Sequence, residues 1–236
     1  MKQTQQKQAK LLGLGDIKQE SALNAGIVKT LIYLLYAILR IVPKEVALKY
    51  LDKNNSKLNF KTLDFDGKFL ELIGANPSHN FYAICYANPK FGKSNFSYQF
   101  AKYMIKFGKV LYCASEEGIS QTTKEKIIQN GLDKSDKVEV LATRELNRLS
   151  EKLKEGFAFV IIDSAQMLNL SSDDVQKLRK DNPDTAFLVI LQVTKQGNFR
   201  GSQEWTHNCD CVIKFEDVGI ASQNGRFGSG TYKVFE

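Results

Sequence analysis

The sequence predicts an α/β protein whose mainly parallel central sheet is flanked by helices. From about residue 58 onwards, apolar runs bounded by turn residues alternate with stretches of helical character. The apolar runs contain few polar residues, which is typical of strands that are buried on both faces. Strands of this kind form parallel sheets when helices separate them along the chain, so we expect helices on both sides of the sheet.

The expected strands and helices follow one another in a regular order. The strands are FYAICY (81–86), KVLYCA (109–114), VEVLA (138–142), FAFVIID (157–163), AFLVILQV (186–193) and CVIKFE (211–216), with a last pair near 219–221 and 231–235. The helices between them are expected over 93–107, 122–130, 144–155 and 172–180. Gly108 and Gly156 stand where helix C-caps are expected.

Residues 1–57 are predicted to form an N-terminal tail and helical segment, which serves oligomerisation or contact with a partner. Two helices are expected, over 21–42 and 44–52, because Pro43 between them does not fit a helix interior. The polar stretch DKNNSK (52–57) is the expected domain boundary, so that 58–236 form the second domain.

The apolar run 25–42 raises the question of a membrane. It carries Lys29 and Arg40, which leave a short uncharged centre, whereas a spanning helix needs roughly 20 mostly apolar residues. Lys29, Tyr33, Tyr36 and Arg40 recur at helical spacing and form a narrow polar stripe. We therefore favour a buried or oligomer-interface helix over attachment to a membrane surface or a membrane span.

Composition limits the compartment and the partners. The 236 residues are 43% hydrophobic and 25% charged, as in ordinary globular proteins, and the net charge is +7. A basic chain favours a polyanionic partner, although an AT-rich genome also produces Lys-rich sequences. Cys85 and Cys113 lie in apolar runs, and Cys209 and Cys211 form a single C-x-C pair, so neither a zinc site nor a disulfide framework is expected. No secretory signal is recognised in the first 20 residues, and we expect a cytoplasmic location.

A phosphate-binding loop is predicted between the first expected strand and the helix that follows it. ANPKFGKS (87–94) matches G-x-x-x-x-G-K-[ST] except that Ala87 replaces the first glycine. Backbone N–H groups of such a loop and the helix N-terminus hold phosphate oxygens. Lys93 is expected to reach the β- and γ-phosphates of ATP, and Ser94 to bind Mg²⁺. The nucleotide-binding residues are predicted to be Ala87, Asn88, Pro89, Lys90, Phe91, Gly92, Lys93, Ser94 and Asn95.

Three further polar residues are predicted to join this site because each ends an expected strand. Asp163 ends FVIID, a Walker B pattern, and is expected to orient Mg²⁺ beside Ser94. Glu116 or Glu117, in SEEG after KVLYCA, can position the attacking water as a general base. Gln192 ends LVILQ, where its amide can sense the γ-phosphate. Each also has a plain structural reading, as a solvated acidic helix entry or an ordinary polar strand end.

This constellation resembles the RecA superfamily, most closely its RadA/Sms branch, with DnaB-type helicases as neighbours. The resemblance covers about 63–236 and rests on FLELIGANPSHNFYAICYANPKFGKS, VLYCASEEG, VIIDSAQML and LVILQVTKQGNFRGSQEWTHNCDCVIKFE. It implies a RecA-like ATPase core, with Glu116 rather than Glu117 as the catalytic glutamate. It also implies that the loop 195–207 faces a central channel, where Lys195 and Arg200 would contact the phosphates of DNA, single-stranded in our expectation, and Trp205 would stack a base.

The sequence also departs from the family pattern. The K-N-R-F-G motif that reaches a neighbouring subunit's nucleotide is NGRFG here, so Asn224 replaces the lysine while Arg226 remains. Arg226 can act as an arginine finger in trans, Lys233 or Lys195 can replace the lysine, or trans activation is weak. The zinc module and the protease-like domain of RadA have no counterpart in the sequence.

Three functions follow from these observations. The first is a DNA-dependent ATPase of recombination, repair or replication that assembles into a ring, such as a hexamer, or a filament, with ATP and Mg²⁺ as cofactors. The second is a DNA packaging or transfer ATPase of a virus or mobile element. The third is a regulatory subunit that binds ATP with little turnover, which the altered finger motif permits.

Overall fold

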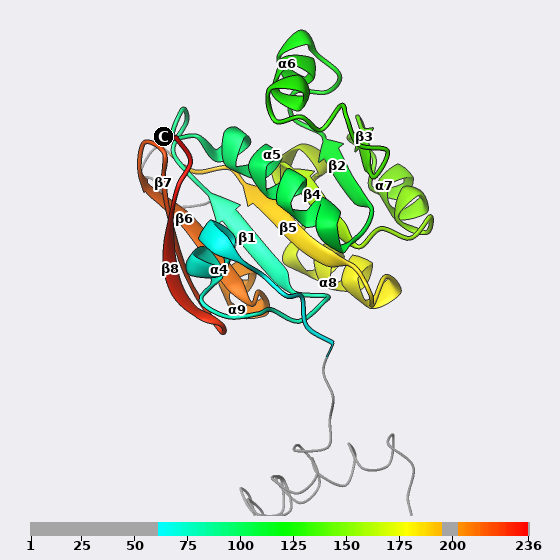
Figure 1. Ribbon diagram of the computed structural model, residues 1–236. Helices are drawn as coiled ribbons and strands as arrows, with labels where there is room; N and C mark the ends of the chain where they lie inside the picture. The colour runs from blue at the N-terminus through cyan, green and yellow to red at the C-terminus, as the bar shows by residue number, and fades with distance from the viewer. Residues whose placement is uncertain (1–60, 195–202, 236) are drawn as a thin grey trace, which may run out of the picture. The chain divides into compact units, whose positions relative to one another are not determined.

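A computed structural model describes residues 61–194 and 203–235, and within them one eight-stranded sheet forms the centre (Figure 1). The strands lie in the order β3-β2-β4-β5-β1-β6-β7-β8. They comprise β1 (Tyr82–Tyr86), β2 (Val110–Ala114), β3 (Val138–Leu141), β4 (Phe159–Asp163), β5 (Ala186–Leu191), β6 (Cys211–Asp217), β7 (Ile220–Gly225) and β8 (Gly228–Lys233). The first six pair in parallel, and β7 and β8 add an antiparallel edge.

Helices cover both faces of the sheet. One face carries α4 (Gly67–Ile73) and α5 (Lys93–Met104), and the other carries α7 (Leu146–Leu153), α8 (Ser172–Asp181) and α9 (Glu204–Asn208) (Figure 1). The remaining helical elements are α6 (Gln121–Gln129) and the two 3-10 turns η3 (Ile105–Phe107) and η4 (Ala165–Leu168). This arrangement confirms the predicted α/β fold with a mainly parallel sheet.

The period of two along each strand divides the core into two layers. In β1, Ala83 and Cys85 face the layer of α4 and α5, while Tyr82 and Ile84 face the layer of α7 and α8. All four side chains are fully buried, as are those of β4 and β5. The apolar runs are therefore apolar because helices cover the strands on both faces, as the sequence pattern predicts.

An aromatic cluster attaches α4 to the sheet and to the antiparallel edge. The Phe69 ring stacks on Phe100 of α5 at 5.0 Å between centroids and on Tyr232 of β8 at 4.8 Å. Gly230 permits this packing, because a Cβ atom at that position would overlap the backbone oxygen of Glu71 in α4. The helix α4 is not among the predicted elements; it is short and has no side-chain N-cap hydrogen bond.

The described elements match most of the predicted ones within a few residues. The predicted last pair is the β7–β8 hairpin, whose first strand is longer than expected, and the helix expected over 93–107 ends as the 3-10 turn η3. The helices expected over 21–42 and 44–52 and the boundary at 57/58 lie outside the described residues. Among the residues that the structure describes, no helix is both long and apolar enough to cross a membrane.

Candidate nucleotide-binding site

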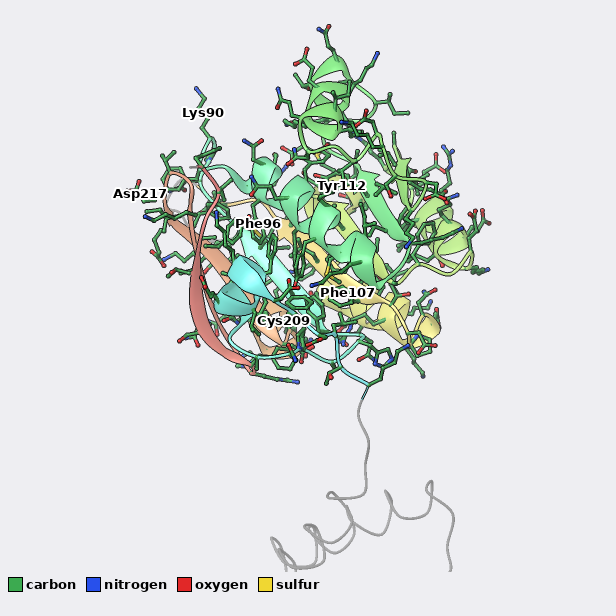
Figure 2. All side chains as sticks on the ribbon, viewed as in Figure 1. Lys90, Phe96, Phe107, Tyr112, Cys209 and Asp217 are labelled. Atoms are coloured by element: carbon green, nitrogen blue, oxygen red, sulfur yellow. The ribbon has the colours of Figure 1, made fainter. Side chains whose placement is uncertain are left out.

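The predicted phosphate-binding loop connects the carboxyl end of β1 to the first turn of α5. Its turn is closed by a 3.3 Å hydrogen bond from the Phe91 N–H to the Asn88 carbonyl. Lys90, with φ 69°, and Gly92, with φ 98°, adopt left-handed conformations, and the Lys90 side chain is exposed (Figure 2). Ala87 does not have a positive φ, so the alanine fits where the motif has its first glycine.

The N-terminus of α5 is free to bind an anion. Gly92 occupies the N-cap position, no side chain caps the helix, and its first turn contains no acidic residue. The first N–H groups of a helix lack partners within it and carry partial positive charge, to which Lys93 adds a full one. This end of α5 therefore has the chemistry to hold phosphate oxygens.

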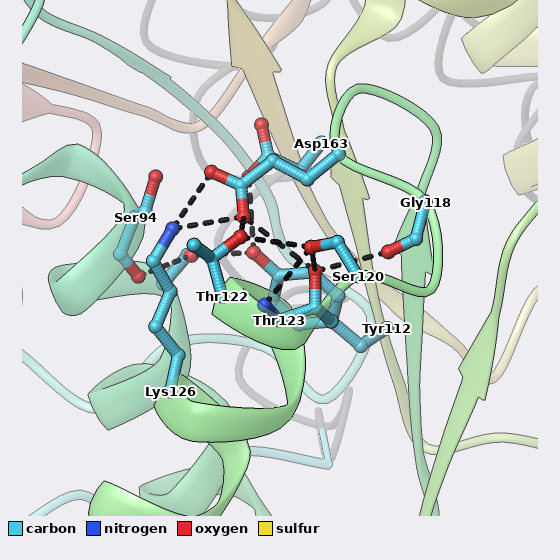
Figure 3. Close-up of polar contacts among 10 residues, drawn as sticks. Ser94, Tyr112, Gly118, Ser120, Thr122, Thr123, Lys126 and Asp163 are labelled. Carbon is cyan, nitrogen blue, oxygen red and sulfur yellow. Dashed lines mark hydrogen bonds and ion pairs between the residues drawn. The ribbon is translucent and has the colours of Figure 1, made fainter.

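A chain of hydroxyl groups connects the start of α5 to Asp163 (Figure 3). The Ser97 Oγ donates to the Ser94 carbonyl at 2.8 Å and lies 2.8 Å from the Tyr112 hydroxyl. The Tyr112 hydroxyl in turn donates to Asp163 Oδ2 at 3.0 Å. Tyr112 is buried on β2, so β2 holds the carboxylate of β4 in a fixed position relative to Ser94.

Asp163 is a buried acid whose pKa depends on burial and on neighbouring groups that act in opposite directions. Burial raises the pKa of the Asp163 carboxyl above its ordinary value, while the Lys93 ammonium and the Tyr112 hydroxyl act to lower it. Glu116 and Glu117 raise it further through their negative charge. A buried carboxylate that is linked through Tyr112 and Ser97 to the uncapped start of α5 fits Mg²⁺ with phosphate, because hard cations prefer oxygen ligands.

Glu116 and Glu117 follow β2 and have different surroundings. Glu117 forms an ion pair with Lys126 of α6, whose Nζ lies 2.7 Å from Oε1 and 2.9 Å from Oε2 (Figure 3). Glu116 is exposed, and its backbone N–H donates to the Asp163 carbonyl at 2.9 Å. Across the described ranges, no hydrogen bond or ion pair engages the Glu116 carboxylate. It is therefore the free acid of the two and lies directly beside Asp163 in the fold.

Gln192 follows β5 and is tied to the segment after Asp163. Its backbone N–H donates to the Oε1 atom of Gln166 in η4 at 2.9 Å. The same bond joins the end of β5 to the turn that follows β4. Gln192 is half-buried, at the same edge of the sheet as Asp163 and the phosphate-binding loop.

An apolar surface borders the loop 87–92 where it meets the β6–β7 turn. The Phe235 ring lies against Gly92 and Gly219, two glycines with positive φ at which a Cβ atom would press on the ring. The Gly219 N–H donates to the Phe91 carbonyl at 2.8 Å, which joins the β6–β7 turn to the loop. Val218, Ile220 and Phe235 are 56%, 38% and 45% exposed, and they account for three of the five exposed large hydrophobic residues in the described part of the chain.

Arg226 lies near the amino end of β1, away from the carboxyl ends of the parallel strands where the loop lies. It occupies the β7–β8 turn, and its Nη1 is 3.1 Å from Asp210 Oδ1. Asp210 also accepts the backbone N–H of Tyr82, the first residue of β1. Since the phosphate-binding loop follows the last residue of β1, the length of the strand, roughly 15 Å, separates Arg226 from the loop of its own chain.

Of the three residues predicted to bind DNA, only Trp205 lies among the described residues. Trp205, on α9, is only 3% exposed and packs in the core layer of α7 and α8. A ring buried to this extent has no face on which a base can stack, so the predicted stacking role of Trp205 is not supported, and its role is to anchor α9. Lys195 and Arg200 lie outside the described residues.

The four cysteines are buried and free. Burial raises the pKa of Cys85, Cys113 and Cys211 to about 12 and that of Cys209 to about 11, which keeps all four protonated. They pack as small hydrophobic side chains. In residues 61–194 and 203–235, no group of three or more His, Cys, Asp or Glu side chains is arranged to hold a metal ion.

No protein-family model matches the sequence, and no curated protein matches it either. Solved structures do match the fold. One of them, an ATPase domain, superposes with a TM-score of 0.56 at 16% identity, covering 80% of this chain and 93% of that one. The flagellar accessory protein FlaH from Methanocaldococcus jannaschii gives 0.53 at 13% identity, covering 73% of this chain and 92% of that one. The KaiC-like protein PH0186 from Pyrococcus horikoshii OT3 gives 0.51 at 12% identity, covering 74% and 100%.

These similarities show the fold of the chain. The chain has the fold of the RecA-like P-loop ATPases, and the identities are too low to specify a branch within that fold. The predicted residues Lys93, Ser94, Asp163, Glu116 and Gln192 lie at the carboxyl ends of β1, β2, β4 and β5, which is where ligands bind in open α/β sheets.

The sequence pattern did not indicate the residues whose side chains link the strand ends at this site. Tyr112, Ser97 and Gln166 were not predicted to take part, although their side chains link the strand ends. Tyr112 carries a detectable signal, because a hydroxyl inside an otherwise apolar strand requires a partner. Gln166 belongs to VIIDSAQML, one of the segments that carry the family resemblance, whereas Ser97 carries no signal that distinguishes it from other polar residues.

Proposed function

We propose that this chain binds ATP with Mg²⁺ and hydrolyses it as a RadA-like ATPase that acts on DNA. The observation that carries the proposal is the convergence of an uncapped helix N-terminus, Lys93, Ser94 and the buried Asp163 at one edge of the sheet, with the free carboxylate of Glu116 beside them. Separately, each feature is common in α/β proteins. Together they supply a phosphate cradle, a cation ligand and a general base.

Each residue has a distinct role in this proposal. The loop 87–92 and the first N–H groups of α5 hold the phosphates, and Lys93 neutralises their charge. Bound at Ser94 and oriented by Asp163, Mg²⁺ would stabilise the charge that develops on the phosphate oxygens. Glu116 accepts the proton of the attacking water, and Gln192 reports the γ-phosphate to the segment that follows β5.

The apolar surface of Val218, Ile220 and Phe235 supports a nucleotide rather than a simple phosphate as the ligand. It borders Gly92, and an aromatic ring with two aliphatic side chains suits the flat face of a base. The base would then lie beside the β6–β7 turn, while the phosphates lie at the start of α5.

Assembly is part of the proposal because Arg226 is remote from the loop of its own chain. If Arg226 acts as a finger, it acts on a nucleotide held by a neighbouring subunit, as a ring or filament would arrange. The basic net charge of +7 and the resemblance of the 195–207 loop support DNA as the polyanion that the assembly binds.

The test is ATP turnover by the full chain, measured over a range of protein concentrations with and without single-stranded DNA. Wild-type turnover should rise with DNA, and turnover per chain should rise with protein concentration as subunits assemble. Lys93→Ala and Glu116→Gln should each lower turnover at least a hundredfold, and Glu116→Gln should still bind ATP. Unchanged hydrolysis by Lys93→Ala would show that the site is wrongly assigned.

A second function is favoured by the surroundings of Arg226. This side chain forms an ion pair with Asp210 of its own chain, and Asn224 stands where the related motif has a lysine. A finger held in this way and lacking its neighbouring lysine suits a regulatory subunit that binds ATP and turns it over slowly. Tight ATP binding with negligible turnover, with or without DNA, would support this second function.

A further inference from the structure

The peptide that joins Ser115 to Glu116 is held from two directions. Its N–H donates to the Asp163 carbonyl at 2.9 Å, and its carbonyl accepts a hydrogen bond from Arg144 Nε at 3.2 Å. The Ser115 hydroxyl adds a third bond, to the Ser164 carbonyl at 3.0 Å. The direction in which the Glu116 side chain leaves the backbone therefore depends on β4 on one side and on Arg144 on the other.

Arg144 keeps most of its hydrogen-bonding capacity. A guanidinium has five N–H donors, and the Ser115 carbonyl takes one of them. In the described part of the chain, no hydrogen bond or ion pair engages the terminal nitrogens of Arg144 or any part of the Arg148 guanidinium. Both side chains are exposed, and they lie within four residues of each other around the start of α7.

These two arginines line a cavity of about 300 Å³ between the segments that follow β2 and β3. Small-ligand sites have volumes of roughly 300–1,000 Å³, so the cavity can accept a phosphate group with part of what it is attached to. The first turn of α7 begins here without a side-chain cap hydrogen bond, which leaves its N–H groups available to an anion.

Acidic groups face the same cavity and limit the strength of binding. Glu116, Glu117 and Glu145 also line it, and the charge of Glu117 is already neutralised by Lys126. Within the described residues, no hydrogen bond or ion pair engages the carboxylates of Glu116 and Glu145, so two arginines oppose two glutamates and the cavity is suited to a weakly bound effector rather than to a permanent ligand. Its chemistry favours the planar, two-pronged contact that arginine makes with phosphate oxygens.

We propose that this cavity is an effector site for a phosphate group, which Arg148 and the terminal nitrogens of Arg144 bind and which activates hydrolysis by fixing the position of Glu116. The inference rests on the proposed ATPase function, and it assigns Arg144 as a positioning residue. Phosphate at the terminal nitrogens orders the long side chain while Nε keeps its bond to the Ser115 carbonyl. The group can be a phosphodiester of single-stranded DNA or free phosphate, since both present the same oxygens.

The test compares turnover by the full chain with oligodeoxythymidylate, with inorganic phosphate, and with chloride at the same ionic strength. We expect at least one phosphate source to raise wild-type turnover about tenfold, the size of one charge-assisted hydrogen bond. In Arg148→Ala the ratio of turnover with and without that source should fall to about one. In Arg144→Lys, which keeps the charge but cannot bridge both partners, basal kcat should fall about tenfold while the KM for ATP stays the same.

Lys154→Ala is the matched control, because Lys154 is an exposed cation at the other end of α7. It should respond like the wild type. Stimulation by the oligonucleotide alone identifies DNA as the source, and stimulation by phosphate alone identifies the free ion. The proposal is overturned if neither source stimulates the wild type while it hydrolyses ATP, or if Arg148→Ala is stimulated as strongly as Lys154→Ala.

A binding measurement separates this inference from the proposed function. If the wild type does not hydrolyse ATP, the proposed function fails, and the cavity is then tested by titrating the labelled oligonucleotide and inorganic phosphate into each variant. Arg148→Ala should bind at least one of the two, the oligonucleotide or inorganic phosphate, about tenfold more weakly than Lys154→Ala. Equal binding by the two variants overturns the effector site whatever the turnover.

Discussion

Replacing Tyr112 by phenylalanine removes the hydroxyl that holds Asp163 and leaves the shape of the core unchanged. That hydroxyl lies 3.0 Å from Asp163 Oδ2 and 2.8 Å from Ser97 Oγ, and the residue is 1% exposed. A hydrogen bond to a charged group contributes about 1.5–3 kcal/mol. Removing a group that orients a metal ligand typically weakens metal binding or activity about 10–100-fold. We expect the Mg²⁺ concentration for half-maximal turnover to rise by a factor in that range.

The pH dependence of the same variant has a definite sign. The Tyr112 hydroxyl lowers the pKa of Asp163, and burial raises it. Without the hydroxyl the pKa of Asp163 rises further, and the carboxyl must be ionised to orient Mg²⁺. The acid limb of kcat/KM for ATP should therefore move to higher pH in Tyr112→Phe, as a pH–rate profile at saturating Mg²⁺ would measure.

Tyr232→Phe provides the matched control, because the Tyr232 hydroxyl is also largely buried and bonds to Gln99 at 2.9 Å, away from Asp163. Both variants should lose some free energy of unfolding, and only Tyr112→Phe should change the Mg²⁺ requirement and the pH profile. If the two variants need the same Mg²⁺ concentration and share one acid limb, Tyr112 is a structural residue and the reasoning about Asp163 is refuted.

Three further predictions concern single residues of the site and its surroundings. Because burial raises the pKa of Asp163, the ionised carboxylate destabilises the folded protein at pH values above that raised pKa. Asp163→Asn should therefore unfold at a higher urea concentration than the wild type at pH 7 without metal. This difference should shrink as the pH falls towards about 3.9, the ordinary pKa of an aspartate. Phe235→Ala should raise the dissociation constant for ATP about tenfold by loss of base stacking, and it should leave the dissociation constant for inorganic triphosphate unchanged. Ile128 is an exposed residue on α6, and Ile128→Ala should change neither constant. Trp205 is the only tryptophan of the chain and is buried, so the fluorescence of the folded protein should be blue-shifted and insensitive to single-stranded DNA; quenching by DNA would contradict its place in the core.

The sheet could be predicted because each buried strand is a short continuous stretch of sequence that is almost entirely apolar. The run FYAICY is apolar throughout and FAFVIID is apolar up to its last residue, Asp163, and the buried strands β1 and β4 lie within them. The polar residues that end such strands were predictable for the same reason, since the carboxyl ends of parallel strands meet at one edge. Asp163, at the end of β4, and Glu116, just after β2, come together there as expected.

The rest depends on contacts between distant parts of the chain. The family resemblance placed Trp205 in a loop that faces a channel, and only the packing of α9 against α8 buries it. Tyr112 and Asp163 are far apart in sequence and become partners because β2 and β4 are neighbours in the sheet. Arg144 belongs to the segment after β3, and no local pattern shows that it contacts the peptide before Glu116.

The two groups that chemistry would require at this edge are held by different neighbours. Tyr112, from within β2, holds the Asp163 carboxylate, whereas Arg144, from the segment after β3, holds the peptide that carries Glu116. Two bonds join these arrangements, one from the Glu116 N–H to the Asp163 carbonyl and one from the Ser115 hydroxyl to the Ser164 carbonyl. Because the Asp163 contact is buried and the Arg144 residue is exposed, the proposed effector would act on Glu116 without disturbing Asp163. In the proposed mechanism, this arrangement would allow nucleotide binding and the rate of hydrolysis to be controlled separately.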